Sequence, residues 1–282
     1  MNDQFSGKIA VVTGGTQGLG EAVARLFAER GAAGLVISGR DKERGKAVAA
    51  DLSKGGCRTH FVAGDLVKVE VASRVVGKAD QAFGRVDALV NAAAITDRGN
   101  ILDTSPELFD RMFGINARAP FFLMQEAAKV MIREKIPGTM VNILSMAVHG
   151  SLPHIIAYSG SKAALATMTK SAAFQLMRNR IRINGLAIGW MDTPGEDRIQ
   201  RHYHGGGDTW LKKAEKKAPF GRILKPTEVA RAVAFMASDE SGMMTGAIVD
   251  FDQQVLGCAE GAIWPAQPMS LEVVSPASVR AA

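Results

Sequence analysis

Short apolar runs alternate along the chain with longer segments that have a helical pattern of apolar positions. The short runs predict strands at 9–15, 34–38, 60–65, 86–94, 138–145, 181–189 and 247–251. The longer segments predict helices at 18–30, 41–54, 68–83, 117–135, 158–179 and 226–238. Strands that are apolar on both faces and alternate with helices are typical of a parallel sheet covered on both sides. The pattern therefore predicts an α/β fold with a doubly wound parallel sheet, and no linker or repeat divides the chain.

The composition is that of a soluble globular protein, with 47% hydrophobic and 22% charged residues among 282. No apolar run approaches the roughly 20 residues that a membrane-spanning helix requires, and no signal-peptide pattern opens the chain. Cys57 and Cys258 fall in no metal-binding or redox spacing, which suits a reducing compartment. These features predict a cytoplasmic protein with no metal site.

The net charge of +6 is scattered along the chain rather than clustered. Its densest run, WLKKAEKKAPFGR at 210–222, predicts an amphipathic helix with one solvated face. Because no aromatic platform accompanies these charges, we favour this interpretation over a nucleic-acid or membrane patch.

A glycine-rich segment, TGGTQGLG at 13–20, follows the first predicted strand and opens the first predicted helix. Gly14, Gly18 and Gly20 permit a tight turn, a close backbone approach and close packing of the helix. The free N–H groups at the start of that helix would then face a pyrophosphate. A glycine cluster alone is a weak signal, but at this junction of a doubly wound sheet it predicts a dinucleotide site.

The segment YSGSKAA at 158–164 places Tyr158 four residues before Lys162, on one face of a predicted helix. A free tyrosine has a pKa of about 10 and is a poor proton acceptor at pH 7. Because a neighbouring ammonium favours the phenolate, we expect the pKa of Tyr158 to fall toward the range where a general acid or base is efficient. Without other motifs, the simpler interpretation would be that Tyr158 and Lys162 are a surface pair with no catalytic role.

The T-G-x-x-x-G-x-G loop, joined to the Tyr158-x-x-x-Lys162 pair, resembles the short-chain dehydrogenase/reductase family over about residues 8–252. The resemblance implies a Rossmann fold and a nicotinamide-dependent interconversion of an alcohol and a carbonyl. It implies four catalytic residues, in which Tyr158 exchanges the proton and Lys162 lowers its pKa and binds the ribose. The other two are Ser145, which orients the reacting oxygen, and Asn116, which sustains a water relay.

The same resemblance implies the cofactor contacts. Asp65 would accept from the adenine amino group, although it could also cap the next helix. Asn91 ends the fourth strand, with alanines where the family has a second Asn and a Gly, and Ile188 replaces a usual proline in the turn at 187–193. The implied contacts are Gly14, Thr16, Gln17, Gly18, Leu19, Gly20, Arg40, Asp65, Leu66, Asn91, Ala93, Tyr158, Lys162, Gly189, Met191 and Thr193.

The residues after the second predicted strand bear on the choice of cofactor. Dinucleotide folds place an acid there that binds the ribose 2′-hydroxyl of NAD. Here Gly39 leaves space, and Arg40 offers a planar charged fork for a phosphate. Asp41 is interpreted as a helix cap, and Thr16 and Gln17 are neutral, so one strong charge partner is expected. We expect NADP (NADPH) to be preferred, with NAD as the weaker alternative.

Residues 1–255 are predicted to form a single Rossmann-type oxidoreductase domain with a substrate loop at about 192–219, followed by a C-terminal extension at 256–282. HGGG within the loop suggests a hinge and therefore a mobile lid. The alternative is a solvated loop whose histidines have no role. The candidates for the substrate pocket are Ser145, His149, Trp190, His202 and His204.

The polar content of this loop favours a small hydroxylated or anionic substrate, such as a sugar, polyol or hydroxy/keto compound. The alternatives are a 3-oxoacyl thioester reductase and a non-catalytic NADP-binding regulatory protein, which would be expected to lack part of the catalytic set. The resemblance implies a homo-oligomer, a tetramer, that pairs the helices at 117–135 and 158–179 across a two-fold axis. A small-molecule substrate is expected, with neither a nucleic-acid nor a membrane partner.

Overall fold

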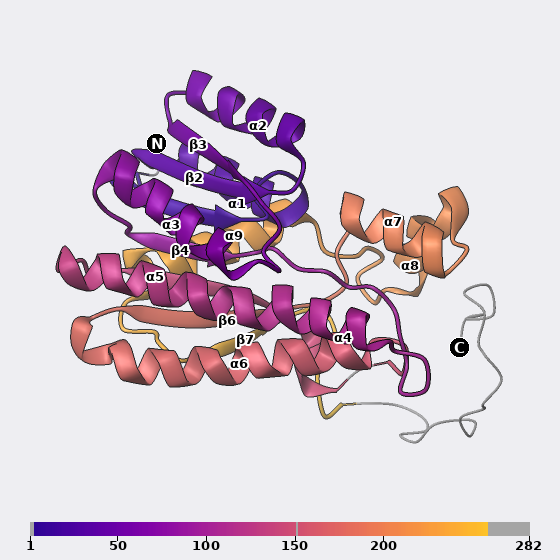
Figure 1. The fold of residues 1–282 in the computed structure, drawn as a ribbon. Coiled ribbons are helices and arrows are strands. Elements are labelled where there is room, and N and C mark those ends of the chain that lie inside the picture. The colour runs from indigo at the N-terminus through magenta and orange to yellow at the C-terminus, as the bar shows by residue number, and fades with distance from the viewer. Residues whose placement is uncertain (1–2, 151, 259–282) are drawn as a thin grey trace.

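The computed structural model describes residues 3–150 and 152–258. Its centre is a seven-stranded parallel sheet in the order β3-β2-β1-β4-β5-β6-β7 (Figure 1). The predicted α/β fold with a doubly wound parallel sheet is confirmed. The strands are β1 (Ile9–Thr13), β2 (Gly34–Gly39), β3 (Arg58–Ala63), β4 (Ala88–Asn91), β5 (Thr139–Ser145), β6 (Arg182–Ile188) and β7 (Ile248–Phe251).

The six helices predicted between the strands are all present, with ends that differ by a few residues. They are α1 (Gly18–Glu29), α2 (Lys42–Lys54), α3 (Val69–Phe83), α5 (Ala119–Arg133), α6 (Ile156–Leu176) and α9 (Pro226–Ala237). The predicted amphipathic helix at 210–222 is the shorter α8 (Trp210–Lys217). Two further helices are additions to the prediction, α4 (Pro106–Phe113) and α7 (Pro194–Tyr203).

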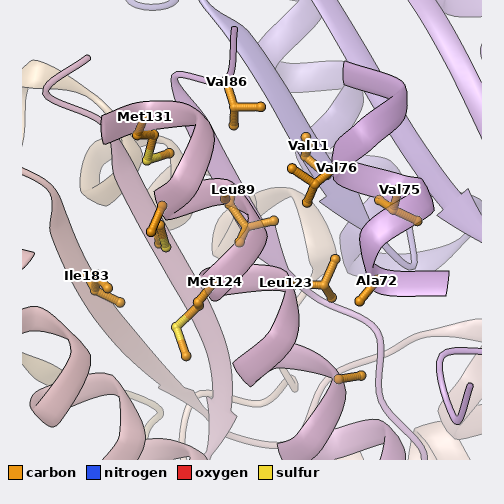
Figure 2. Close-up of a cluster of buried hydrophobic side chains, with 14 of the residues drawn as sticks. Val11, Ala72, Val75, Val76, Val86, Leu89, Leu123, Met124, Met131 and Ile183 are labelled. Carbon is orange, nitrogen blue, oxygen red and sulfur yellow. The ribbon is translucent and has the colours of Figure 1, made fainter. Parts of the chain in front are cut away.

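Two apolar clusters, one on each face of the sheet, form the core. Side chains of α3, α5 and α6 pack on one face, and side chains of α1, α2 and α9 pack on the other. Figure 2 shows the first cluster, in which apolar residues of α3 and α5 meet residues of β1 and β4. The labelled members from these four elements are Val11, Ala72, Val75, Val76, Leu89, Leu123, Met124 and Met131. Both faces are therefore closed, and ligands must enter at an end of the sheet.

The strand order reverses between β1 and β4, whose last residues, Thr13 and Asn91, are paired. The Thr13 hydroxyl accepts hydrogen bonds from the N–H groups of Ala92 at 3.1 Å and Ala93 at 3.2 Å. This contact turns the chain away from β4 just beyond the strand end. In doubly wound sheets, ligands bind in the crevice outside such a switch point.

The segment from the start of α7 to the end of α8, residues 194–217, lies beside the sheet, to the right in Figure 1. We refer to this segment as the lid. Gly205 and Gly207, between the two helices, have φ values of +58° and +50°, a conformation that favours glycine. Trp210 is buried with Ala214 and Ile223 in a small apolar cluster of their own. The predicted substrate loop is therefore a pair of helices with a separate small core.

Within the described part of the chain, no helix is long and apolar enough to cross a membrane. Of the predicted C-terminal extension, residues 259–282 lie outside the described residues.

Candidate active site

A cleft of about 1890 Å³ lies at the carboxyl ends of the strands and extends to the lid. It is lined by the glycine loop, the residues that follow β2, β3, β4, β5 and β6, the start of α6, and both lid helices. A single small-molecule pocket measures roughly 300–1,000 Å³. The cleft is therefore large enough for a dinucleotide together with a substrate.

The glycine loop has the shape that a pyrophosphate site requires. Gly18 has a φ of +56°, and a Cβ atom on Gly20 would lie 2.3 Å from the carbonyl oxygen of Gly14. The side chain of Gln17, at the start of α1, makes no capping hydrogen bond to the helix. The first N–H groups of α1 are therefore available to an anion, and the helix dipole favours negative charge there. Thr16, Gln17 and Leu19 line the cleft with Gly14, Gly18 and Gly20.

Two arginines face the cleft after β2, where the sequence indicated one. Arg40 lines the cleft as predicted, and Arg44, in the first turn of α2, lines it as well. The Arg44 guanidinium lies 3.1 Å from the Asp41 carboxylate and donates to the Gln17 side chain at 2.8 Å. Asp41 accepts from the Arg44 N–H at 3.0 Å, which confirms its role as the cap of α2.

Gly39 lines the cleft beside Arg40. A Cβ atom at this position would lie 2.7 Å from the hydroxyl oxygen of the buried Thr16. The contact excludes an acidic side chain at this position unless Thr16 moves. That Gly39 leaves space for a phosphate stays a prediction.

Asp65 and Leu66 line the cleft after β3. Asp65 accepts from the Val67 N–H at 3.1 Å and from Arg111 at 3.0 Å. Burial tends to raise the pKa of Asp65, but these two hydrogen bonds and the charges of Arg111 and Arg40 together hold the pKa below its ordinary value. The cap of α3 is Lys68, so the alternative role of Asp65 as that cap is not found.

Asn91 lies in the sheet rather than in the wall of the cleft. Its amide donates to the side chain of Asn142 at 2.8 Å, which in turn donates to Thr169 on α6 at 2.8 Å. All three side chains are buried. Ala93 lines the cleft in place of Asn91. Asn91 therefore joins β4, β5 and α6, and its predicted direct contact with the cofactor has no support in its position.

The turn after β6 contributes Gly189, Met191 and Thr193 to the cleft wall. Met191 forms a parallel bridge to Leu224, which connects the turn to the segment that follows the lid. The Thr193 hydroxyl accepts from the Glu196 N–H at 3.0 Å and caps α7. Thr193, which was predicted to contact the cofactor, therefore also fixes the start of the lid.

Ser145, Tyr158 and Lys162 line the same cleft. The Ser145 hydroxyl is near enough to Tyr158 to favour a lower pKa of its phenol. The Lys162 ammonium lies 5.9 Å from the centre of the Tyr158 ring and donates to the Ile143 carbonyl at 2.7 Å. The Ser145 oxygen also accepts from the Ala147 N–H at 3.2 Å, which orients the hydroxyl at the end of β5. A strand end and one helix face thus bring these three groups together.

The electrostatics of this group differ from the expectation. Burial raises the pKa of Tyr158, against the opposing effects of the Ser145 hydroxyl and the charge of Arg98. The fall in the pKa of Tyr158 is therefore not found in the protein chain alone, and the part of the prediction that depends on a bound, positively charged nicotinamide stays a prediction. Burial also lowers the pKa of Lys162 to about 8, because this residue is only 2% exposed.

Asn116 lies in a π-helical turn (Gly114–Arg118) between α4 and α5, and it is fully buried. Its side chain accepts from the Ile95 N–H at 3.0 Å and donates to the Ile95 carbonyl at 2.9 Å. It also donates to the Ser161 hydroxyl at 3.1 Å, next to Lys162 on α6. Asn116 therefore holds the loop after β4 against α6 rather than contacting Lys162 with its side chain.

The same cleft has a polar wall formed by Arg98, His154, Glu196 and His204, of which only His204 was predicted. Arg98, from the loop after β4, is only 15% exposed. It donates from Nε to Nε2 of His204 at 3.2 Å and from Nη1 to the Thr96 carbonyl at 2.8 Å. Its Nη2 atom lies 4.0 Å from Oε1 of Glu196, on the lid. No spacing motif in the sequence marks Arg98.

His154 belongs to the same wall. Its ring centre lies 5.3 Å from that of His204. Burial lowers the pKa of His154 to about 4, and the positive charge of Arg98 acts in the same direction. Burial likewise lowers the pKa of His204. Both rings are therefore neutral at pH 7, and Arg98 is the cation of this wall.

The predicted substrate candidates separate into two groups. His149, Trp190 and His204 line the cleft with Ser145, and Trp190 donates to Glu196 at 2.8 Å. His149 lies 2.9 Å from Asp250, which fixes its ring near β7. His202 is exposed on α7, packs against the Tyr203 ring and lies outside the cleft lining.

The strand order, the glycine loop and the Tyr158–Lys162 pair together define a dinucleotide-dependent oxidoreductase. The family model described as Enoyl-(Acyl carrier protein) reductase matches residues 14–253. The chain belongs to the short-chain dehydrogenase/reductase family and is an NAD(P)-dependent oxidoreductase.

Individual relatives cover nearly the whole domain. An uncharacterized oxidoreductase of Thermotoga maritima is 36% identical over 249 residues, which are 88% of this chain and 97% of the relative. Galactitol 2-dehydrogenase of Agrobacterium fabrum is 31% identical, over 84% of this chain and 93% of its own. The structure of L-sorbose reductase from Gluconobacter frateurii, complexed with NADPH and L-sorbose, superposes with a TM-score of 0.84 at 27% identity. It covers 92% of this chain and 100% of its own.

Proposed function

We propose that this protein is an NADP(H)-preferring oxidoreductase that interconverts a secondary alcohol and a carbonyl on a sugar, a polyol or a small hydroxy/keto compound. The observation that carries the proposal is that one cleft is lined by Tyr158 and Ser145, by the glycine loop and by the polar wall of Arg98, Glu196 and His204. In the reductive direction, a carbonyl, NADPH and a proton give an alcohol and NADP. The sugar- and polyol-related relatives support this substrate class.

The residues of the cleft have distinct roles in this proposal. Bound NADPH supplies the hydride. Tyr158 gives its hydroxyl proton to the carbonyl oxygen during reduction and takes it back during oxidation. Ser145 donates a hydrogen bond to the same oxygen, and Lys162 holds positive charge beneath Tyr158 and binds the ribose hydroxyls. Asn116 is a positioning residue, because it anchors Ile95 and the loop that carries Arg98.

The preference for NADP rests on the two arginines after β2. A 2′-phosphate needs charge-assisted donors, and Arg40 and Arg44 both face the cleft there. Gly39 has no side chain, so the carboxylate that would bind the 2′-hydroxyl of NAD is missing at this position. Arg44 would turn from Asp41 and Gln17 toward the phosphate. Two cations therefore replace the single one that the sequence indicated.

We further propose a homotetramer in the cytoplasm. Phe121 and Ile132 on α5 and Phe174 on α6 are large apolar side chains on the surface of a single chain. Exposed apolar groups that gather on neighbouring helices are typical of an interface. Cys57 and Cys258 are both free, which suits a reducing compartment.

The test is to follow the absorbance of NADPH and NADH with L-sorbose, galactitol and acetoacetyl-CoA as substrates, the last for the thioester alternative. Turnover of a sugar or polyol, faster with the phosphorylated cofactor and lost in Tyr158→Phe, would support the proposal. Turnover of the thioester alone would favour the 3-oxoacyl reductase. Cofactor binding without turnover of any substrate would favour a regulatory role.

A further inference from the structure

Arg98 and Glu196 form an ion pair that is too wide for direct hydrogen bonding. Their side chains are each 15% exposed, and Nη2 of Arg98 lies 4.0 Å from Oε1 of Glu196. A charged hydrogen bond between such groups measures about 2.7–2.9 Å. Both residues line the cleft that also contains Tyr158. The pair therefore presents a donor and an acceptor to the same small volume beside the reacting groups.

The surroundings of the pair hold both side chains in place. Arg98 is fixed through His204 and the Thr96 carbonyl. Glu196 accepts at Oε1 from the Trp190 indole at 2.8 Å and from Gln200 at 2.7 Å, and its Oε2 atom has no hydrogen bond within the described residues. Because these contacts use other atoms of Arg98, Nη2 is left facing Glu196 across the gap. The spacing is therefore set by the loop after β4 on one side and by the lid on the other.

A substrate hydroxyl fits this gap in a way that a carboxylate does not. A hydroxyl oxygen can accept from Nη2 of Arg98 and donate to Oε2 of Glu196, the two atoms of the pair that have no other partner in the described part of the chain. A carboxylate has no proton to donate and would be repelled by Glu196 at close range. An apolar group would leave these two atoms without a hydrogen-bond partner.

On this basis we propose that Arg98 and Glu196 are specificity-determining residues that bind a hydroxyl group near the reacting carbon and reject anionic substrates. This inference rests on the proposed function and narrows it from hydroxylated or anionic compounds to neutral hydroxylated ones. The charge of Arg98 also acts on Tyr158, which places the recognised hydroxyl close to the reacting centre.

The test uses three ketones of equal chain length with the carbonyl at the same carbon, namely L-sorbose, 2-hexanone and 2-oxohexanoate. For each, kcat/KM is measured with NADPH in the unaltered protein, Arg98→Met, Glu196→Gln and the control His202→Ala. The ratio of kcat/KM for L-sorbose to kcat/KM for 2-hexanone cancels effects on proton transfer that both substrates share. Loss of a hydrogen bond to a charged group should lower this ratio roughly 10- to 150-fold in both pocket variants and leave it unchanged in the control.

Glu196→Gln should in addition raise kcat/KM for 2-oxohexanoate relative to kcat/KM for 2-hexanone, because it removes the negative charge that repels the carboxylate.

Calorimetric titration of L-sorbose into the NADP complex of each variant gives a second measurement that needs no turnover. L-sorbose binding should weaken in Arg98→Met and Glu196→Gln only. An unchanged ratio and unchanged binding in both variants would overturn the inference, as would a native preference for 2-oxohexanoate over L-sorbose. If 2-hexanone is reduced while L-sorbose is neither reduced nor bound, the inference fails and the oxidoreductase function stands. If none of the ketones is reduced but L-sorbose binding depends on the pair, the proposed function fails and the inference stands.

Discussion

Replacing Lys162 by Met should change how the stability of the protein depends on pH. Lys162 is 2% exposed, and burial lowers its pKa from 10.5 to about 8. Each tenfold change in proton affinity corresponds to about 1.4 kcal/mol, so the charged form is roughly 3 kcal/mol less favourable in the folded state than in the unfolded state. Met is unbranched and of similar length, and it carries no charge.

The sign follows from the protons bound in each state. Between pH 8 and about pH 10.5, the unfolded chain keeps the Lys162 proton and the folded protein has released it. The free energy of unfolding therefore rises with pH in this window, and the penalty is fully present below it. The native protein should gain about 2 kcal/mol relative to Lys162→Met between pH 7 and pH 9.5.

The assay is urea unfolding of both proteins without cofactor, at one protein concentration and at several pH values. The lost hydrogen bond to the Ile143 carbonyl shifts Lys162→Met by a constant amount, so only the change with pH is informative. Lys170→Met is the matched control, because Lys170 is an exposed lysine on the same helix. A difference between native and Lys162→Met that stays flat across the window would show that the buried ammonium is not destabilised.

Three further outcomes are expected. Tyr158→Phe should lower kcat roughly 10²- to 10⁴-fold with cofactor affinity nearly unchanged, as measured by steady-state kinetics and NADPH titration, and a near-normal kcat would contradict its proposed role. Arg40→Ala and Arg44→Ala should each lower the NADP over NAD ratio of kcat/KM roughly 10- to 150-fold, because each loses a charge-assisted hydrogen bond, and an unchanged ratio in both would refute the phosphate assignment. Phe174→Glu should weaken the proposed tetramer, because it places a charge on the exposed face of α6. A mass of 29.9 kDa for the native protein by light scattering, which is the mass of one chain, would contradict the proposed oligomer.

The fold could be predicted because buried parallel strands leave a plain signal. All seven strands were identified, since runs that are apolar on both faces have few alternatives in a chain of this kind. The helix α4 was missed although Ser105 caps it through a 3.2 Å bond to the Leu108 N–H and Pro106 follows at its first position. Leu108, Phe109, Met112 and Phe113 recur at helical spacing, so the amphipathic pattern was present, but the helix has only eight residues, fewer than the roughly 11–18 over which such a pattern is read.

The reacting groups could be placed for a different reason. Helical spacing fixes Tyr158 relative to Lys162, and the end of a strand fixes Ser145. Arg98 and Glu196 could not be placed, because their separation depends on how the loop after β4 and the lid fold toward each other. Arg44 is an intermediate case. Its position in the first turn of α2 could be predicted from the sequence, but its hydrogen bond to the Gln17 side chain could not.

The lid connects substrate recognition to the acidity of Tyr158. The charge of Arg98 lowers the pKa of Tyr158, and the charge of Glu196 raises it. Arg98 comes from the loop after β4, whereas Glu196 is part of α7, so any outward movement of α7 removes the negative charge and leaves the positive one. With the lid in place, Tyr158 retains its proton more firmly and is suited to act as the acid in carbonyl reduction. With the lid away, we expect the pKa of Tyr158 to be lower and the hydroxyl partner of Arg98 to lose its acceptor, so substrate binding and the pKa of Tyr158 would change together.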